Sequence, residues 1–139
     1  MSFVVFTVEG PPQGKGRPRF RRAGNFVTTY TDQKTKTYEQ TIKAWAQRAI
    51  GSGSPLEGPL SVDLYIRCPV AVSTSKKRTE ACLQNAELPT KKPDIDNVIK
   101  IFLDAMNGIV YKDDTQVVRL SAKKGYSLVP GVDVCVVQI

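Results

Sequence analysis

The alternation of apolar and polar side chains along the chain predicts where its strands lie. Leu60, Val62, Leu64 and Ile66 alternate with polar residues, so residues 60–68 are expected to form a strand with one buried face. Residues 115–124 alternate in the same way. Residues 2–9 carry bulky β-formers without a polar face, as in a largely buried strand, and the valine-rich residues 132–139 predict a final, central strand.

Two other segments repeat their apolar residues at helical spacing. Between Ile95 and Met106 the spacing is i, i+3, i+4, i+7, i+8 and i+11, the strongest helical signal in the chain, and Asn107-Gly108 supplies a stop. Residues 38–49 predict a second helix, with Thr35 or Thr37 as its cap, Gly51 as its end and Trp45 in the core. The whole pattern predicts one α/β or α+β domain over residues 1–139, a small mixed β-sheet covered by two main helices.

Two segments without regular periodicity are rich in basic residues. Residues 13–25 are expected to form an extended, exposed loop that contacts the DNA backbone, with Phe20 offering a stacking face. Residues 73–92 are expected to form a mobile basic segment with one helical turn around residues 79–85. A plain solvated loop is the alternative for both. The candidate DNA-binding residues are Lys15, Arg17, Arg19, Arg21, Arg22, Lys76, Lys77, Arg78, Lys91 and Lys92.

Net charge favours a nucleic-acid partner. The formal charge is +7 over 139 residues, which attracts a polyanion at long range. An anionic membrane surface is the weaker alternative, because the basic residues do not line one strongly amphipathic helix. No apolar run approaches the ~20 residues of a membrane span, so a cytoplasmic protein without membrane contact is expected. The cysteines, Cys68, Cys82 and Cys135, are widely separated and are expected to be reduced thiols.

The chain contains no histidine. That absence excludes Ser-His-Asp and Cys-His catalysis, histidine-ligated zinc and imidazole as a general base. Any chemistry must therefore use carboxylates, lysines or a metal ion.

Aspartates gather between positions 94 and 114. Asp94 and Asp96 stand two residues apart at the start of the helix predicted at 95–106, and the segment after that helix is expected to return Asp113 and Asp114 toward them. Oxygen ligands without nitrogen or thiolate select Mg²⁺, with Mn²⁺ as a substitute, and such a site suits phosphodiester cleavage.

Simpler interpretations of these aspartates exist. Asp96 can cap the helix, and Asp113-Asp114 can form a turn. A calcium-binding EF-hand loop is excluded, because Val98, Ile99 and Ala105 occupy the positions where that loop needs an oxygen ligand, glycine and glutamate. The residues alone leave two hypotheses, a metal-dependent nuclease and a noncatalytic basic DNA-binding module.

The string PDIDNVIKIFLDAMNGIVYKDDTQV, residues 93–117, resembles the signature of the RusA-type Holliday junction resolvases, in which D-x-D-N-x-x-K opens a helix and D-D-x-Q-V follows it. The resemblance extends to GKGRPRF at 14–20 and to the T-x-x-Y-E pattern at 35–39. It implies that Asp94, Asp96 and Asp114 are metal-binding catalytic acids. It also implies that Lys100 is a catalytic or substrate-positioning lysine. The supporting residues expected around them are Asn97, Asp104 and Asp113.

The same resemblance implies a Mg²⁺-dependent homodimer that places two active sites on opposite strands of a four-way DNA junction, with no organic cofactor. The expected function is a structure-selective endonuclease acting on branched DNA in recombination and repair. A catalytically inactive, junction-binding architectural protein is the alternative, and an RNA-processing nuclease is a third, weaker one.

Lys100 lies four residues after Asp96 and is therefore expected on the same side of the helix, near the metal site. Its alternative role is an exposed ion pair with Asp96 or Asp104.

Overall fold

The computed structural model describes residues 2–16, 19–30 and 32–139, without the side chains of Arg19, Thr29 and Tyr30. In chain order the elements are β1 (Phe3–Glu9), β2 (Arg19–Ala23), β3 (Phe26–Tyr30), α1 (Gln33–Ile50), β4 (Leu60–Pro69), α2 (Lys76–Leu83), α3 (Ile95–Met106), the short 3₁₀ helix η1 (Asp114–Gln116), β5 (Val117–Ser127) and β6 (Gly131–Gln138).

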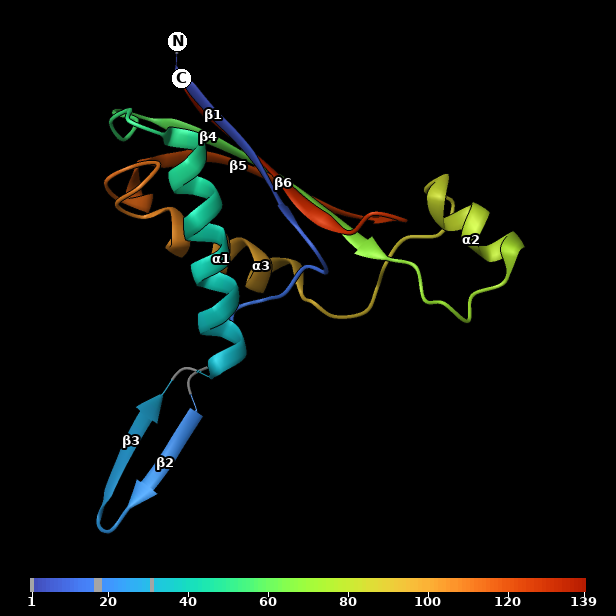
Figure 1. Cartoon of the computed structure of the whole chain (residues 1–139), viewed down its shortest axis with the longest axis horizontal. Coiled ribbons are helices and arrows are strands. Elements are labelled where there is room, and N and C mark those ends of the chain that lie inside the picture. The colour runs from blue at the N-terminus through green and yellow to red at the C-terminus, as the bar shows by residue number, and fades with distance from the viewer. Residues whose placement is uncertain (1, 17–18, 31) are drawn as a thin grey trace.

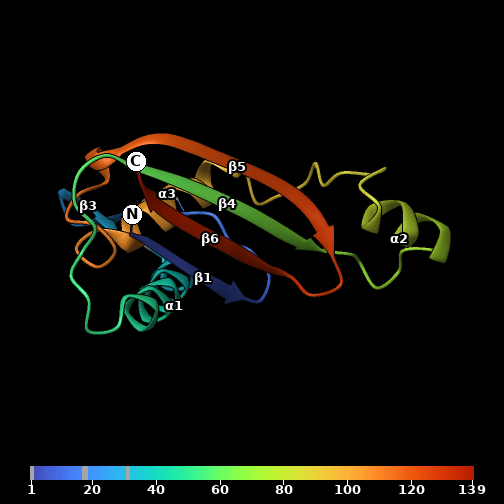
Figure 2. The same cartoon turned by 90° about the horizontal axis from the view of Figure 1, so that it is seen from above.

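A four-stranded sheet in the order β1-β6-β4-β5 forms the body of the fold. Strand β6 pairs antiparallel with both β1 and β4, whereas β4 and β5 are parallel. Helices α1 and α3 cover one face of this sheet and leave the other uncovered (Figures 1 and 2). The fold is therefore a mixed α+β domain, and the predictions of a mixed sheet, two covering helices and a central final strand are confirmed.

The core lies between the covered sheet face and the two helices. Apolar side chains at alternate positions of β4, β6 and β1 meet the stripes of α1 and α3, where Tyr38 packs edge-on against Phe102 with ring centroids 6.0 Å apart. Trp45 packs partly buried against this core, as its place on the stripe predicted. Five residues on one side of helix α3 are buried: Val98, Ile101, Phe102, Ala105 and Met106. The opposite side of the helix therefore faces solvent.

Three details differ from the sequence predictions. Strand β1 is an edge strand whose outer face is uncovered, so Phe3 and Val5 are 66% and 57% exposed instead of buried. Asp32, rather than Thr35 or Thr37, caps α1, because its carboxylate accepts from the backbone N–H of Thr35 at 2.8 Å. Strand β5 runs on to Ser127, beyond the predicted end at residue 124, since its parallel pairing with β4 continues there.

Two basic arms extend from the body. The segment predicted as a loop at 13–25 instead contains β2, which pairs with β3 in an isolated two-stranded ribbon (Figure 1). The segment 73–92 holds the two-turn helix α2 rather than a single turn, because Ser75 caps it and Cys82 is buried where α2 packs on β5. We call these the β2–β3 ribbon and the α2 arm.

All three cysteines, Cys68, Cys82 and Cys135, are free thiols, as the sequence predicted. Within the described residues, no helix has the length and apolarity that crossing a membrane requires.

Candidate active site on helix α3

The N-terminal end of α3 presents two carboxylates to solvent. Asp94 is the N-cap residue, and its side chain makes no capping hydrogen bond, so its oxygens are not used by the helix. Asp96 follows in the first turn and is also exposed. In the described part of the chain, neither carboxylate forms an ion pair with a lysine or arginine. Both are therefore available to bind an external cation.

The same side of α3 continues with charged residues at helical spacing. Lys100 lies one turn after Asp96, and its ammonium is 3.8 Å from a carboxylate oxygen of Asp104, a further turn along. The Lys100 side chain is 64% exposed. The predicted exposed ion pair with Asp104 is thus present, and its exposure leaves the ammonium accessible to a bound phosphate.

The remaining acids lie at the C-terminal end of α3. Asn107, which ends the helix, accepts from the backbone N–H of Asp114 at 2.8 Å, and its amide lies 3.5 Å from the Asp114 carboxylate. Asp113 caps η1 in a reciprocal arrangement with Gln116. These bonds hold the segment after α3 against the end of the helix.

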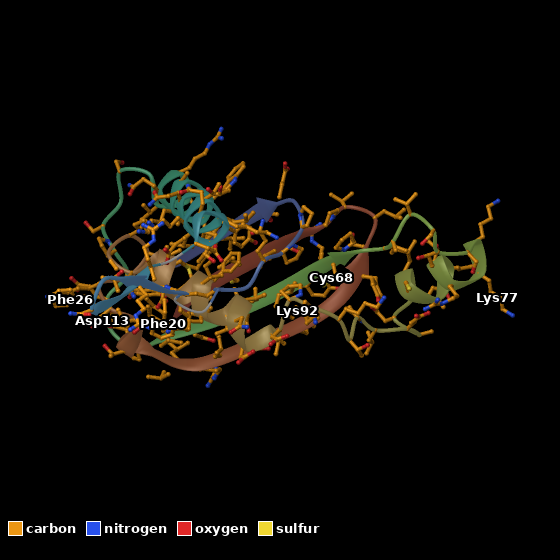
Figure 3. The ribbon with its side chains drawn as sticks, turned by 90° about the horizontal axis from the view of Figure 1, so that it is seen from below. Phe20, Phe26, Cys68, Lys77, Lys92 and Asp113 are labelled. Atoms are coloured by element: carbon orange, nitrogen blue, oxygen red, sulfur yellow. The ribbon has the colours of Figure 1, made fainter. Side chains whose placement is uncertain are left out.

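Asp94, Asp96 and Asp114 therefore do not converge within one chain. Helix α3 has 12 residues, so at a rise of about 1.5 Å per residue its two ends are ~18 Å apart. Figure 3 shows Asp113 well separated from Lys92, which lies just before the N-terminal end of α3. In the described residues no three acidic or thiol side chains are placed to hold one metal ion. The expected return of the chain fails because residues 107–116 turn beside Asn107 rather than running back along the helix.

The glycine-flanked Lys15 ties the two helices together. Its backbone N–H donates to the Asn97 carbonyl at 2.9 Å, and its ammonium is 2.7 Å from Asp104 and 3.5 Å from Glu39 of α1. Burial lowers the pKa of Lys15, but the contacts with Asp104 and Glu39 outweigh it and the pKa is raised overall. Lys15, which the sequence suggested as a DNA contact, is thus engaged inside the protein.

Gly14 and Gly16 allow this close approach. A Cβ at Gly14 would lie 2.7 Å from the Cβ of Asn97, and a Cβ at Gly16 would lie 2.7 Å from the Thr35 hydroxyl oxygen. Two glycines around one lysine are a sequence signal for a backbone that passes tightly between other elements.

An open pocket of about 370 Å³ lies between the N-terminal ends of α1 and α3. Its lining includes Asp94 and Asn97 on one side and Lys34 and Lys92 among its cations. Helix N-termini and lysines both favour a bound anion, and here they adjoin a candidate metal-binding carboxylate. Lys34 was not among the residues predicted from sequence, because a lone lysine at a helix start gives no local signal.

Two buried tyrosines lie beneath this side of the molecule. The Tyr111 hydroxyl donates to the Leu103 carbonyl at 2.7 Å, and burial followed by the charges of Asp114 and Asp104 raises its pKa. Burial raises the pKa of Tyr38 to about 12, although the backbone of Gln13 lowers it in part. Both phenols therefore stay protonated near neutral pH and are not general bases.

The other predicted DNA contacts lie on the two arms. Arg21 and Arg22 are exposed on β2, while Arg17 and the side chain of Arg19 lie outside the described residues. On the α2 arm, Lys76, Lys77, Lys91 and Lys92 are exposed, and Arg78 pairs with Glu87. Figure 3 shows Lys77 near the far end of the α2 arm.

A mixed α+β body with an acid-bearing helix and two exposed basic arms suits a protein that acts on nucleic acid. The family described as endodeoxyribonuclease RusA matches residues 9–137, nearly the whole chain. The uncharacterized protein YqaN of Bacillus subtilis (strain 168) is 37% identical over 141 residues, which cover 100% of this chain and 99% of that protein. The chain belongs to the RusA endodeoxyribonuclease family, and DNA is the substrate that this family acts on.

Proposed function

We propose that this protein is a Mg²⁺-dependent, structure-selective endonuclease that resolves four-way junctions in branched DNA during recombination or repair. The observation that carries the proposal is the pair Asp94 and Asp96, which form no ion pair with the described residues, at the start of α3 beside a lysine-lined pocket in a chain of this family. Mn²⁺ would substitute for Mg²⁺ at a site made of oxygen ligands.

The residues at the start of α3 fit a magnesium ion by their chemistry. Mg²⁺ is usually bound through one or two carboxylates together with waters and substrate phosphate, and Asp94 and Asp96 supply two carboxylates at the protein surface. A bound Mg²⁺ would polarise the phosphodiester and favour hydroxide formation from water.

The chain's own residues would position the DNA strand. Lys34 and Lys92 at the pocket would hold a phosphate next to Asp94, and the exposed ammonium of Lys100 would stabilise charge that develops on the scissile phosphate. Lys15 would act indirectly, because its bonds to Asn97 and Asp104 fix α3 against α1. Asp104 has two lysine partners and would hold Lys100 in place rather than bind metal.

Asp114 needs a different explanation, since it lies at the opposite end of α3. We propose that the protein acts as a homodimer in which the Asp114 end of one chain meets the Asp94 end of the other. An antiparallel, two-fold pairing of α3 helices would do this twice, because an isologous interface repeats every contact. Ile95, which is 38% exposed, and the half-buried Ile99 and Leu103 provide apolar surface beside the charged side of α3 for such a contact.

The test is cleavage of end-labelled four-way junction, flap, duplex DNA and structured RNA, each with and without Mg²⁺. We expect paired symmetric cuts in the junction only when Mg²⁺ is present, and far less cleavage of duplex and RNA. Asp94→Asn should abolish cleavage and retain binding, whereas Asp63→Asn, an exposed acid on the opposite face of the sheet, should cut normally. Junction binding without Mg²⁺-dependent cutting would overturn the proposal.

One observation favours the second candidate, a noncatalytic junction-binding protein. The described part of one chain brings no three acids together, whereas the described lysines and arginines of its two arms are exposed. That protein would bind junctions equally well with asparagine at position 94, and no divalent ion would produce cleavage.

A further inference from the structure

The β2–β3 ribbon stands apart from the body of the protein. It forms its own two-stranded sheet beyond the N-terminal end of α1 (Figure 1). Every residue from Phe20 to Thr28 is exposed, and the turn at Gly24-Asn25 has a positive φ of 62° at Gly24, which suits a two-residue hairpin. A lone two-stranded ribbon is marginally stable in water, so a ribbon whose described side chains are exposed suggests a partner outside the chain.

The strand register places an aromatic ring on each face of the ribbon. Phe20 lies opposite Thr29 and Arg22 opposite Val27, so Phe20, Arg22 and Val27 share one face. Ala23 lies opposite Phe26, which places Phe26 on the other face with Arg21. Phe20 and Phe26 are 73% and 76% exposed (Figure 3), more than Phe3, the most exposed aromatic side chain of the body, at 66%.

Charge identifies the kind of partner. The ribbon carries three arginines, and residues 10–31 contain no aspartate or glutamate, so the partner is a polyanion. Phenylalanine adds a surface on which a base can stack, with sequence tolerance because every base has a flat face. A ribbon with stacking rings on both faces fits a place where base faces are open on two sides.

An intact duplex offers no such place, because its bases are stacked and a protein ribbon in the major groove meets only base edges. The centre of a branched DNA exposes the faces of its terminal base pairs. We propose that the β2–β3 ribbon is a wedge that enters the centre of the four-way junction. There Phe20 and Phe26 stack on the base pairs bordering the opening, and Arg21 and Arg22 contact the flanking phosphates. This inference rests on the proposed action on branched DNA and assigns to the ribbon the recognition of the branch point.

The experiment places the fluorescent base 2-aminopurine either at the branch point or in the middle of one arm, and adds the full-length protein in EDTA so that no strand is cut. We expect fluorescence to rise at the branch point and to stay constant in the arm, because the wedge unstacks only the central bases. Phe20→Ala/Phe26→Ala should remove most of the rise and weaken junction binding about tenfold or more, with duplex binding unchanged. Phe20→Trp/Phe26→Trp should retain the rise.

Phe3→Ala is the matched control, because Phe3 is 66% exposed but lies on the uncovered face of the sheet. It should behave as the parental protein. An equal fluorescence rise with the double alanine variant would overturn the wedge, as would equal weakening of duplex and junction binding, which indicates groove binding. Loss of the wedge with normal Mg²⁺-dependent cutting leaves the proposed function standing, whereas absent junction binding by the parental protein refutes that function itself.

Discussion

At the scale of single residues, Lys100 has two interpretations, a surface ion pair with Asp104 and a contact with the scissile phosphate, and one substitution separates them. Its ion pair with Asp104 is exposed, and such pairs contribute about 0.3 to 0.5 kcal/mol to stability. Lys100→Ala should therefore leave the free energy of unfolding nearly unchanged. If the ammonium meets the scissile phosphate, single-turnover cleavage should fall on the order of a hundredfold.

The measurement for Lys100 is single-turnover cleavage with saturating protein and Mg²⁺, together with urea unfolding. Lys100→Arg should recover only part of the rate, because a planar guanidinium replaces a compact ammonium. If the alanine variant cleaves at the parental single-turnover rate, Lys100 is only a surface ion-pair residue.

Tyr38 makes a second prediction at this scale. It is 6% exposed, and its hydroxyl, although close to the backbone of Gln13, makes no hydrogen bond of normal geometry to a described residue. An unsatisfied buried hydroxyl costs about 1 kcal/mol or more, so Tyr38→Phe should keep or raise the free energy of unfolding at neutral pH. A decrease of more than about 1 kcal/mol in the free energy of unfolding would instead show that the hydroxyl makes a stabilising hydrogen bond.

The pH dependence of the same variant follows from the raised pKa. The folded pKa of Tyr38 is about 12, above its ordinary value of 10.0, so the folded state favours the neutral phenol. The resulting stability is complete below pH 10.0 and is lost as the pH rises toward 12. Tyr38→Phe should lose less stability across this range in urea titrations. The raised pKa of Tyr111 gives the same loss of stability at alkaline pH in the parental protein and in the variant.

At the scale of elements, the β2–β3 ribbon should contribute to DNA affinity and not to folding. Arg21→Ala/Arg22→Ala should lower the slope of log affinity against log salt by about 1.8, since each phosphate contact on duplex DNA adds about 0.9. Thermal unfolding should be unchanged because both side chains are exposed. Arg119→Ala/Lys123→Ala removes two exposed cations from β5 on the uncovered sheet face and should keep the parental slope.

The elements that sequence predicted well are those whose periodicity is imposed by the core. Helix α3 was located to the residue because its buried face repeats over three turns, and β4 because it alternates with one covered face. The ribbon was missed because it has no buried face to impose a pattern. The sequence does carry a hairpin signal, because the turn residues Gly24-Asn25 stand between Arg19–Ala23 and the β-favouring Phe26–Tyr30. Strand β1 was expected to be buried because sequence does not show which sheet face lacks a cover.

The candidate site, too, has a part that sequence predicts and a part that depends on the tertiary structure. Asp94 and Asp96 could be placed together because they are neighbours on one helix start. Their relation to Asp114 depends on the direction that the chain takes after α3, which the bond between Asn107 and Asp114 determines. The role of Lys15 also depends on tertiary structure, since Asp104 lies 89 residues away along the chain.

At the scale of the whole molecule, the separated acids give the homodimer a direct test. If each active site joins Asp94 of one chain to Asp114 of the other, Asp94→Asn and Asp114→Asn chains should each be inactive alone. In a mixed dimer, one site then carries both substitutions and the other carries neither. Random exchange makes half of the dimers mixed, so about a quarter of all sites should be intact.

Mixing the two inactive variants should therefore restore about a quarter of the parental cleavage, as single nicks instead of paired cuts, because each mixed dimer has one working site. Asp94→Asn mixed with Asp96→Asn is the control and should stay inactive, since both acids stand at the same end of α3. A site built within one chain after a movement of residues 107–116 predicts no recovery in either mixture. Sedimentation would establish that dimers form, and labelling one variant with a heavy isotope would let mass spectrometry of intact dimers show that subunits had exchanged, so that absent recovery would count against the shared site.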